Sequence, residues 1–318
     1  GINPTYGTPA NAFDSVTPRC PGGSSSGSAV SVARQLAPIT VGTDTGGSVR
    51  IPAAWNGLVG LKTTSGVVPA KGVLPLSRQF DTVGPLAQDV ADANALFAIL
   101  CGGKAADLIG TSVRGKRFLV PDNIVWDNAE EGVVACLEEA FEKLVAKGAI
   151  VERGKVPEFD AVTDLCNNVG NLFSPEAYGE WRDVIESQSD QMYDEVTKRF
   201  KMAENMSSID VAEAMHKLRS LRASYLKRVA GYDAVLMPTT PITPPAIAPL
   251  EADSAAYAKA NISALYNTRL GNLLTLSSLT LPAGQTGGLP VGLMMFGLPK
   301  RENALLRNGS GIEKALAS

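Results

Sequence analysis

Residues 21–64 read PGGSSSGSAVSVARQLAPITVGTDTGGSVRIPAAWNGLVGLKTT and contain two turns of small residues, GGSSSGS at 22–28 and TDTGGSVR at 43–50. Between them, segment 25–36 carries small and apolar residues at helical spacing, and 37–44 is a short apolar run that ends in a turn. This pattern predicts a helix followed by a buried strand. Because the two turns flank one helix and one strand, both can meet at the same edge of a sheet.

The rest of the chain alternates strand-like and helix-like segments. RFLVPD at 117–122, an amphipathic segment at 128–148 and AIVERG at 149–154 predict a strand, a helix and a second strand, which is the unit of a parallel sheet. Further expected helices and strands lie at 58–64, 87–101, 234–240, 255–278, 279–284 and 291–299, and a last helix starts near Arg301. Residues 1–318 are therefore interpreted as a single α/β domain, with a mixed, largely parallel sheet covered by helices on both faces and a helical insertion at about 155–231.

Composition narrows the classes of function. The 29 basic and 32 acidic residues nearly cancel, giving a net charge of -3, which disfavours nucleic acid and anionic membranes as partners. No apolar run reaches the length of a membrane helix. The four cysteines are widely spaced and only one histidine is present, so we expect no metal site, and few cysteines in a long chain indicate a cytoplasmic location.

The serine turns pose a chemical question, because a serine hydroxyl is a weak nucleophile until a base takes its proton. A serine, histidine and aspartate triad is disfavoured, since the one histidine, His216, lies among polar neighbours in a helical pattern typical of a surface residue. Cys20 has no activating cation or histidine partner in the pattern and is interpreted as a passive small residue. The base must be of another kind.

Taken together, the two turns resemble the amidase signature family of amide hydrolases. FDTVGPLAQDVAD at 80–92, AVLMPTTP at 234–241 and LPAGQTGGLPVGLMMFG at 281–297 agree with it, and the resemblance extends from residue 1 to about 315. It is weakest at 155–230, where such families vary. It implies the amidase signature fold and catalysis by a Ser, cis-Ser, Lys triad without metal or organic cofactor.

The resemblance also implies roles for single residues. By position Ser48 is the nucleophile, and Ser24, reached through a cis bond after Gly23, relays the proton between Ser48 and a lysine. The backbone N–H groups of Thr45, Gly46, Gly47 and Ser48 form the oxyanion hole.

Three further residues are expected to support the turns. Asp44 and Arg50 stand on the two shoulders of the second turn and are expected to pair and hold it rigid rather than to act as catalysts. Ser26 is the residue of the serine run that we expect to contribute a hydrogen bond to the Ser24 turn.

The lysine of this triad has no counterpart in the expected place. In the family it lies well upstream of the first serine turn, whereas the first lysine here is Lys62, in a segment that is structural in the family. Together with the abrupt start at GINPTYG, this suggests an N-terminally incomplete chain; a portion supplied by another chain and a degenerate enzyme are the alternatives. We expect the chain alone to be inactive for want of this lysine, since losing one triad member costs orders of magnitude in rate.

The function expected from these patterns is hydrolysis of a small-molecule amide through an acyl-enzyme, releasing ammonia or an amine and a carboxylate. One alternative is the A-type glutaminase subunit of a tRNA-dependent amidotransferase, and another is a non-catalytic protein that retains the fold. The substrate pocket is expected to be built largely from residues 155–230 and 241–249, and the sequence leaves a homodimer open.

Overall fold

The protein is built around one eight-stranded sheet, which the computed structural model describes within residues 1–317. The strand order is β1-β3-β2-β7-β8-β6-β4-β5. The strands are β1 (Ile39–Asp44), β2 (Val59–Lys62), β3 (Thr82–Ala87), β4 (Arg117–Pro121), β5 (Ile150–Gly154), β6 (Ala234–Pro238), β7 (Ser277–Thr286) and β8 (Leu289–Gly297).

The sheet is mixed, as expected, but it is not largely parallel. The strand, helix and strand unit at 117–154 does form a parallel pair, β4 with β5, and β6 extends it in parallel. Among residues 1–317, the other five of the seven strand pairings are antiparallel. The expectation was wrong because it extended one local unit to the whole sheet, whereas strand pairing elsewhere is set by contacts between distant segments.

The centre of the sheet is a hairpin of β7 and β8, the two strands with the longest register. Only Gly287 and Gly288 separate them, with φ of 55° and 78°. A two-residue turn with positive φ at both positions matches the twist of the flanking strands, and glycine adopts this conformation without steric cost.

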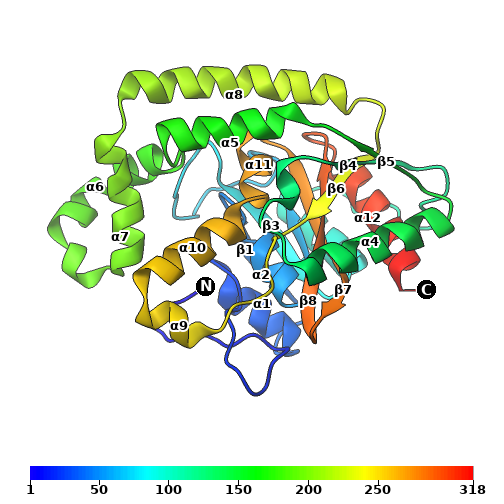
Figure 1. Ribbon diagram of the computed structural model, residues 1–318, viewed down its shortest axis with the longest axis horizontal. Helices are drawn as coiled ribbons and strands as arrows, with labels where there is room; N and C mark the ends of the chain where they lie inside the picture. The colour runs from blue at the N-terminus through cyan, green and yellow to red at the C-terminus, as the bar shows by residue number, and fades with distance from the viewer. Residues whose placement is uncertain (318) are drawn as a thin grey trace.

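Twelve α-helices are described, with three short 3-10 turns. The α-helices are α1 (Ser26–Ala33), α2 (Arg50–Trp55), α3 (Val90–Cys101), α4 (Glu131–Ala146), α5 (Pro157–Val169), α6 (Ser174–Ser187), α7 (Asp194–Lys201), α8 (Ser208–Arg228), α9 (Ile247–Ala252), α10 (Ser254–Leu265), α11 (Thr268–Leu273) and α12 (Glu302–Leu316). The 3-10 turns are η1 (Ile124–Trp126), η2 (Ser189–Gln191) and η3 (Met202–Asn205). Residues 155–231, the expected helical insertion, hold α5 to α8, which form the upper and left part of Figure 1.

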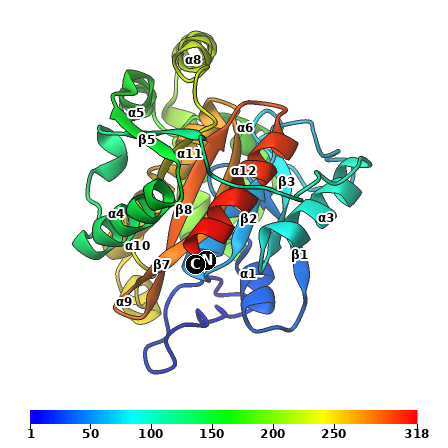
Figure 2. The same ribbon diagram turned by 90° about the vertical axis from the view of Figure 1, so that its right-hand side faces the viewer.

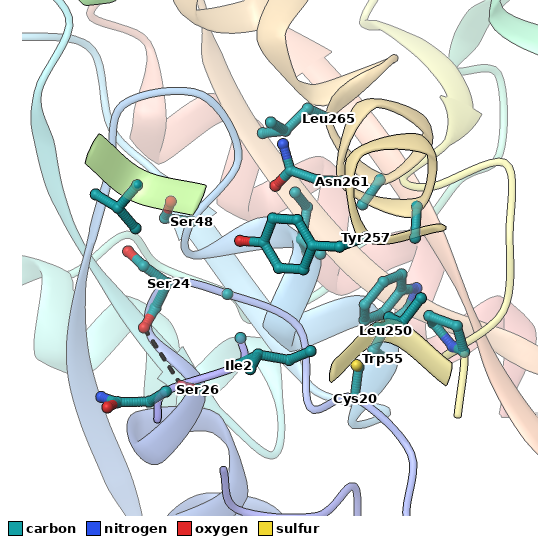
Figure 3. Close-up of a pocket in the computed structure, with 18 of the residues that line it drawn as sticks. Ile2, Cys20, Ser24, Ser26, Ser48, Trp55, Leu250, Tyr257, Asn261 and Leu265 are labelled. Carbon is teal, nitrogen blue, oxygen red and sulfur yellow. Dashed lines mark hydrogen bonds between the residues drawn. The ribbon is translucent and has the colours of Figure 1, made fainter. Parts of the chain in front are cut away.

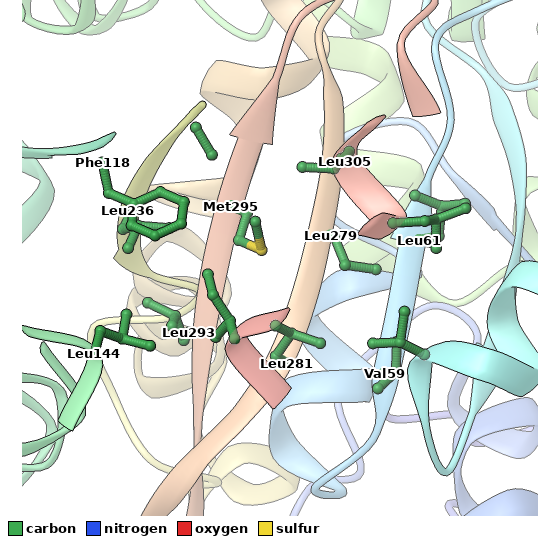
Figure 4. Packing of buried hydrophobic residues seen from close by; sticks show 14 of the residues in the cluster. Val59, Leu61, Phe118, Leu144, Leu236, Leu279, Leu281, Leu293, Met295 and Leu305 are labelled. Atoms are coloured by element: carbon green, nitrogen blue, oxygen red, sulfur yellow. The ribbon is translucent and has the colours of Figure 1, made fainter. Parts of the chain in front are cut away.

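Helices cover both faces of the sheet, as expected. Helices α3, α4 and α12 pack on one face, where Figure 2 shows α12 lying across the strands. Figure 4 shows the apolar layer beneath them, in which Leu293 and Met295 of β8 face this side. Their neighbours Met294 and Phe296 face the opposite layer, which includes residues of α5, α8 and α11. This alternation places an apolar core on each side of the sheet.

Three local expectations differ from the structure. Residues 50–55 form helix α2 and residues 82–87 form strand β3, although neither was expected as a regular element. Strand β3 contains Pro85 and its sequence lacks alternation because it is buried on both faces. The single helix expected at 255–278 is instead α10 and α11, followed by the start of β7.

None of the helices within residues 1–317 combines the length and the apolar character that crossing a bilayer requires.

Candidate active site

The first serine turn leads from a cis peptide bond into helix α1. The bond joining Gly23 to Ser24 is cis, the conformation that the resemblance implied. Ser24 is exposed, and its carbonyl accepts a hydrogen bond from the hydroxyl of Ser26 at 3.5 Å, drawn as a dashed line in Figure 3. The contact expected for Ser26 is therefore present.

Other serines of the run attach the start of α1 to strand β1. The hydroxyl of Ser25 donates to the carbonyl of Thr43 at 3.3 Å, and that of Ser28 donates to Val41 at 3.0 Å. The backbone N–H of Ser25 donates to the carbonyl of Ser48 at 3.2 Å. This last bond joins the two serine turns directly, so they meet at one edge of the sheet.

The second turn has its carbonyl groups bound to the surrounding protein. The carbonyl of Gly46 accepts from the hydroxyl of Thr268 at 2.7 Å, and that of Gly47 accepts from the N–H of Ile51 at 2.8 Å. The carbonyl of Ser48 accepts from Ser25. By contrast, the N–H groups of residues 45–48 have no hydrogen-bond acceptor within residues 1–317. The turn thus leaves four donors free beside the hydroxyl of Ser48.

Gly47 is the residue that this backbone path requires. Its φ is 147°, and a Cβ at this position would lie 2.3 Å from Oγ1 of Thr268 and 2.7 Å from Cδ1 of Ile51. A side chain here would displace Thr268, the residue that holds the carbonyl of Gly46.

Asp44 and Arg50 form a fully buried pair beneath the turn, both with 0% exposed side chains. Oδ1 of Asp44 accepts from Nη2 of Arg50 at 2.9 Å, and Oδ2 accepts from Nε at 3.0 Å. Oδ2 also accepts from the backbone N–H of Val49 at 3.1 Å. Burial alone would raise the pKa of Asp44, but the charge and hydrogen bonds of Arg50 outweigh it and hold the pKa at about 2.

Helix α11 supplies two buried residues to this network that the sequence did not reveal. Thr268 binds Gly46, and Asn272 donates to Oδ1 of Asp44 at 2.8 Å while its own oxygen accepts from Arg50. Both residues are polar yet fully or almost fully buried. The signal available in the sequence was Asn272 within the apolar run LGNLL at 270–274, since a buried polar group requires a partner.

A cavity of about 240 Å³ opens beside both serines. Ser24 and Ser48 lie next to each other at one side of it in Figure 3, and the apolar wall includes Trp55 and Leu265. The hydroxyl of Tyr257 and the amide of Asn261, both on α10, point into the same space. Arg199 of α7 also lines it. Contrary to the expectation, the segments 155–230 and 241–249 do not form most of this cavity, because they supply only Val196, Arg199 and Pro245, and the other lining residues lie within 1–55 and 250–265.

Ser24 and Ser48 also line a second cavity of about 480 Å³. This cavity is bounded by the loop between β2 and β3 and includes Thr45 and Asp81. Oδ1 of Asp81 accepts from the hydroxyl of Thr45, and its Oδ2 accepts from the N–H groups of Leu76 and Ser77 at 2.8 and 3.0 Å. Both serines therefore border two cavities.

Other candidates from the sequence lie outside this chemistry. Lys62 lines neither cavity, and its Nζ donates to the carbonyls of Thr63 and Leu276 at 2.8 Å each. Burial, with the charge of Arg50, lowers the pKa of Lys62 to about 7. His216 is exposed on α8.

Cys20 borders the first cavity, but its thiol is not activated. Burial raises the pKa of Cys20 to about 11, so the thiol stays protonated at neutral pH. Within residues 1–317, no group of three or more His, Cys, Asp or Glu side chains could hold a metal ion.

Comparison with known proteins places these features in a family. The family model described as Amidase matches residues 1–306. The chain is 35% identical to 2-amino-5-chloromuconic acid deaminase of Comamonas testosteroni, over 98% of this chain and 68% of the relative. It is 32% identical to the A-type subunit of glutamyl-tRNA(Gln) amidotransferase from Symbiobacterium thermophilum, over 96% of this chain and 69% of the relative. A crystal structure of an amidase is similar with a TM-score of 0.88 and 30% identity, over 99% of this chain and 71% of the other.

Proposed function

The chain belongs to the amidase signature family of hydrolases, and on that premise we propose that it cleaves an amide bond through an acyl-enzyme on Ser48. In this mechanism the hydroxyl oxygen of Ser48 attacks the amide carbonyl carbon, and its proton passes by way of Ser24 to the departing nitrogen. The C–N bond then breaks and ammonia or an amine leaves. Water repeats the attack on the ester and releases the carboxylate, which regenerates Ser48.

The observation that carries the proposal is the set of free N–H groups at Thr45, Gly46, Gly47 and Ser48, next to a serine that borders two cavities. Donors held in place before the reaction stabilise the negative charge that develops on the carbonyl oxygen, and removing one such donor costs about 3 to 4 kcal/mol of transition-state stabilisation. Gly23, Ser26, Asp44 and Arg50 hold this arrangement and are positioning residues.

The family resemblance implies a lysine as the terminal base. No lysine among residues 1–317 lines either cavity, and Nζ of Lys62 is bound to two carbonyls, so we assign this role to none of them.

Names of the relatives support ammonia as the departing group. One is a deaminase and another belongs to an amidotransferase, and both names describe removal or transfer of an amino group.

Covalent labelling tests the proposal. A fluorophosphonate in excess is expected to modify Ser48 in the full-length gene product, with the site located by mass spectrometry of peptides, and Ser48→Ala should remove the adduct. Failure to label Ser48 in the full-length gene product, with the protein folded by circular dichroism, would favour the non-catalytic alternative.

A glutaminase component of a larger assembly is the second candidate function, favoured by the relatives named as A-type subunits of an amidotransferase. Release of ammonia from glutamine that appears only when partner subunits are added would support it. Hydrolysis of simple amides by the full-length gene product without partner subunits would support the first.

A further inference from the structure

The first cavity is lined by the guanidinium of Arg199. Arg199, in the last turn of α7, is half-buried, and within residues 1–317 it takes part in no salt bridge. Its Nε donates to the carbonyl of Glu195 at 3.0 Å and its Nη1 to Oδ1 of Asn261 at 3.3 Å. No partner is recorded for Nη2 in that range.

The nearest acidic side chain on α7 is committed elsewhere. Oε1 of Glu195 accepts from Lys198 at 2.9 Å and from the hydroxyl of Ser254 at 2.6 Å. Of the described residues that line the first cavity, none is acidic, and Arg199 is the one with a cationic side chain. The cavity wall therefore carries the positive charge of Arg199, which the carboxylate of Glu195 offsets only from a distance, because that carboxylate makes no salt bridge with it.

Two further donors border the same space. Asn261 uses its oxygen for Arg199, which leaves its Nδ2 hydrogens without an acceptor in residues 1–317. The hydroxyl of Tyr257 points into the cavity in Figure 3 and has no hydrogen-bond partner there either. The Tyr257 ring is fixed by an edge-on contact with Tyr193, with centroids 5.9 Å apart. A guanidinium with neighbouring neutral donors is the arrangement that binds carboxylates.

We infer that Arg199, with Asn261 and Tyr257, binds a carboxylate on the substrate, and that the substrate is an anionic amide such as the monoamide of a short dicarboxylic acid. The inference rests on the proposed function only in placing the amide end at Ser48. The apolar wall, including Ile51 and Leu265, suits the carbon chain between the amide and the carboxylate.

Binding to a variant that cannot turn over substrate tests the inference. Ser48→Ala protein is titrated calorimetrically with malonamate, succinamate and glutaramate, and with the three corresponding diamides. Each diamide has nearly the same shape as its monoamide but lacks the negative charge. We expect at least one monoamide to bind about tenfold to a hundredfold more tightly than its diamide, because hydrogen bonds to a charged group are the stronger ones.

The same titrations on variants identify the residue responsible. Arg199→Met in the Ser48→Ala background should abolish the preference for the monoamide, and Arg199→Lys should retain only part of it. Lys201→Met removes a positive charge two residues away on the same helix, at a position that lines neither cavity, and should leave the preference unchanged.

Three outcomes would overturn the inference. These are equal binding of monoamide and diamide, a preference that survives Arg199→Met, and no binding of any monoamide. Fluorophosphonate labelling of the wild-type protein is run in parallel. If Ser48 is not labelled but the monoamide is still preferred over the diamide through Arg199, the serine mechanism is refuted and the carboxylate site is not. If Ser48 is labelled but the monoamide is not preferred, the carboxylate site is refuted and the serine mechanism is not.

Discussion

Replacing Asp44 with asparagine should weaken both the fold and the active turn. The carboxylate of Asp44 accepts hydrogen bonds from Arg50, Asn272 and the N–H of Val49, and it is fully buried. An asparagine has one acceptor oxygen, and its amide group would face a donor of Arg50 or Asn272. The charge of Arg50 would then remain buried without compensation.

The expected cost follows from the burial of the pair. Removing one partner of a buried ion pair costs about 3 to 5 kcal/mol, because the other charge stays in the interior unpaired. We therefore expect Asp44→Asn to lower the free energy of unfolding at pH 7 by about this amount, and Arg50→Met to do the same. The double variant should lose less than the sum of the two single variants, since it leaves neither charge unpaired.

The pH dependence supplies a second magnitude. The pKa of Asp44 falls from 3.8 to about 2 on folding, so the carboxylate contributes about 2 kcal/mol of stability above pH 4. This contribution is lost as the pH falls from about 4 towards 2, because the proton then binds the unfolded chain first. The difference in stability between wild type and Asp44→Asn should shrink over that window.

Urea unfolding followed by circular dichroism measures these quantities, and fluorophosphonate labelling of Ser48 reports on the turn. Glu186→Gln is the control, because Glu186 pairs with Arg182 on an exposed helix surface and its loss should leave the unfolding free energy almost unchanged. If Asp44→Asn costs no more than this control, or if the two single variants add fully in the double variant, the buried pair does not hold the turn.

Two other substitutions test separate features of the same region. Gly47→Ala places a methyl group against Thr268 and Ile51 at a φ of 147°. Labelling of Ser48 should therefore slow more than about tenfold, while the far-UV circular dichroism spectrum is retained. Labelling at the wild-type rate would contradict the proposed role of the turn. Burial lowers the pKa of Lys62 to about 7, so the unfolded chain binds this proton more tightly and the free energy of unfolding should rise from pH 7 to pH 10. Urea titrations of Lys62→Met should lack this part of the rise. A pH profile identical to that of the wild type would contradict the effect of Lys62.

The local part of the structure could be predicted from the sequence because it is encoded in short segments. The helix and strand between the serine turns, the hairpin strands and the strand, helix and strand unit at 117–154 all follow from periodicity and turn residues. The antiparallel order of the sheet could not be predicted in this way. Strand β2 pairs with β7, more than 200 residues further along, and no local pattern records that choice.

Long-range contacts also explain which site residues were missed. Thr268 binds a carbonyl 222 residues away, and Asn272 reaches Asp44 over 228 residues. Arg199 lies in a segment whose sequence indicates only a polar helix. A buried polar residue in an apolar segment shows that a partner exists, but only the fold shows which one.

The serine turns and the cation of the cavity wall come from different parts of the chain, so substitutions should affect the reactivity of Ser48 and the choice of substrate separately. The carbonyls of the turn with free N–H groups are bound by the hydroxyl of Thr268 and the N–H groups of Ile51 and Ser25. The buried pair of Asp44 and Arg50, at the end of β1 and the start of α2, holds the two ends of this turn. The cation of the cavity instead comes from α7, which packs on α6 and η3. Substitutions at Arg199 should therefore change which amide binds while labelling of Ser48 by a neutral fluorophosphonate continues. Substitutions at Asp44 should impair labelling whatever the charge of the probe.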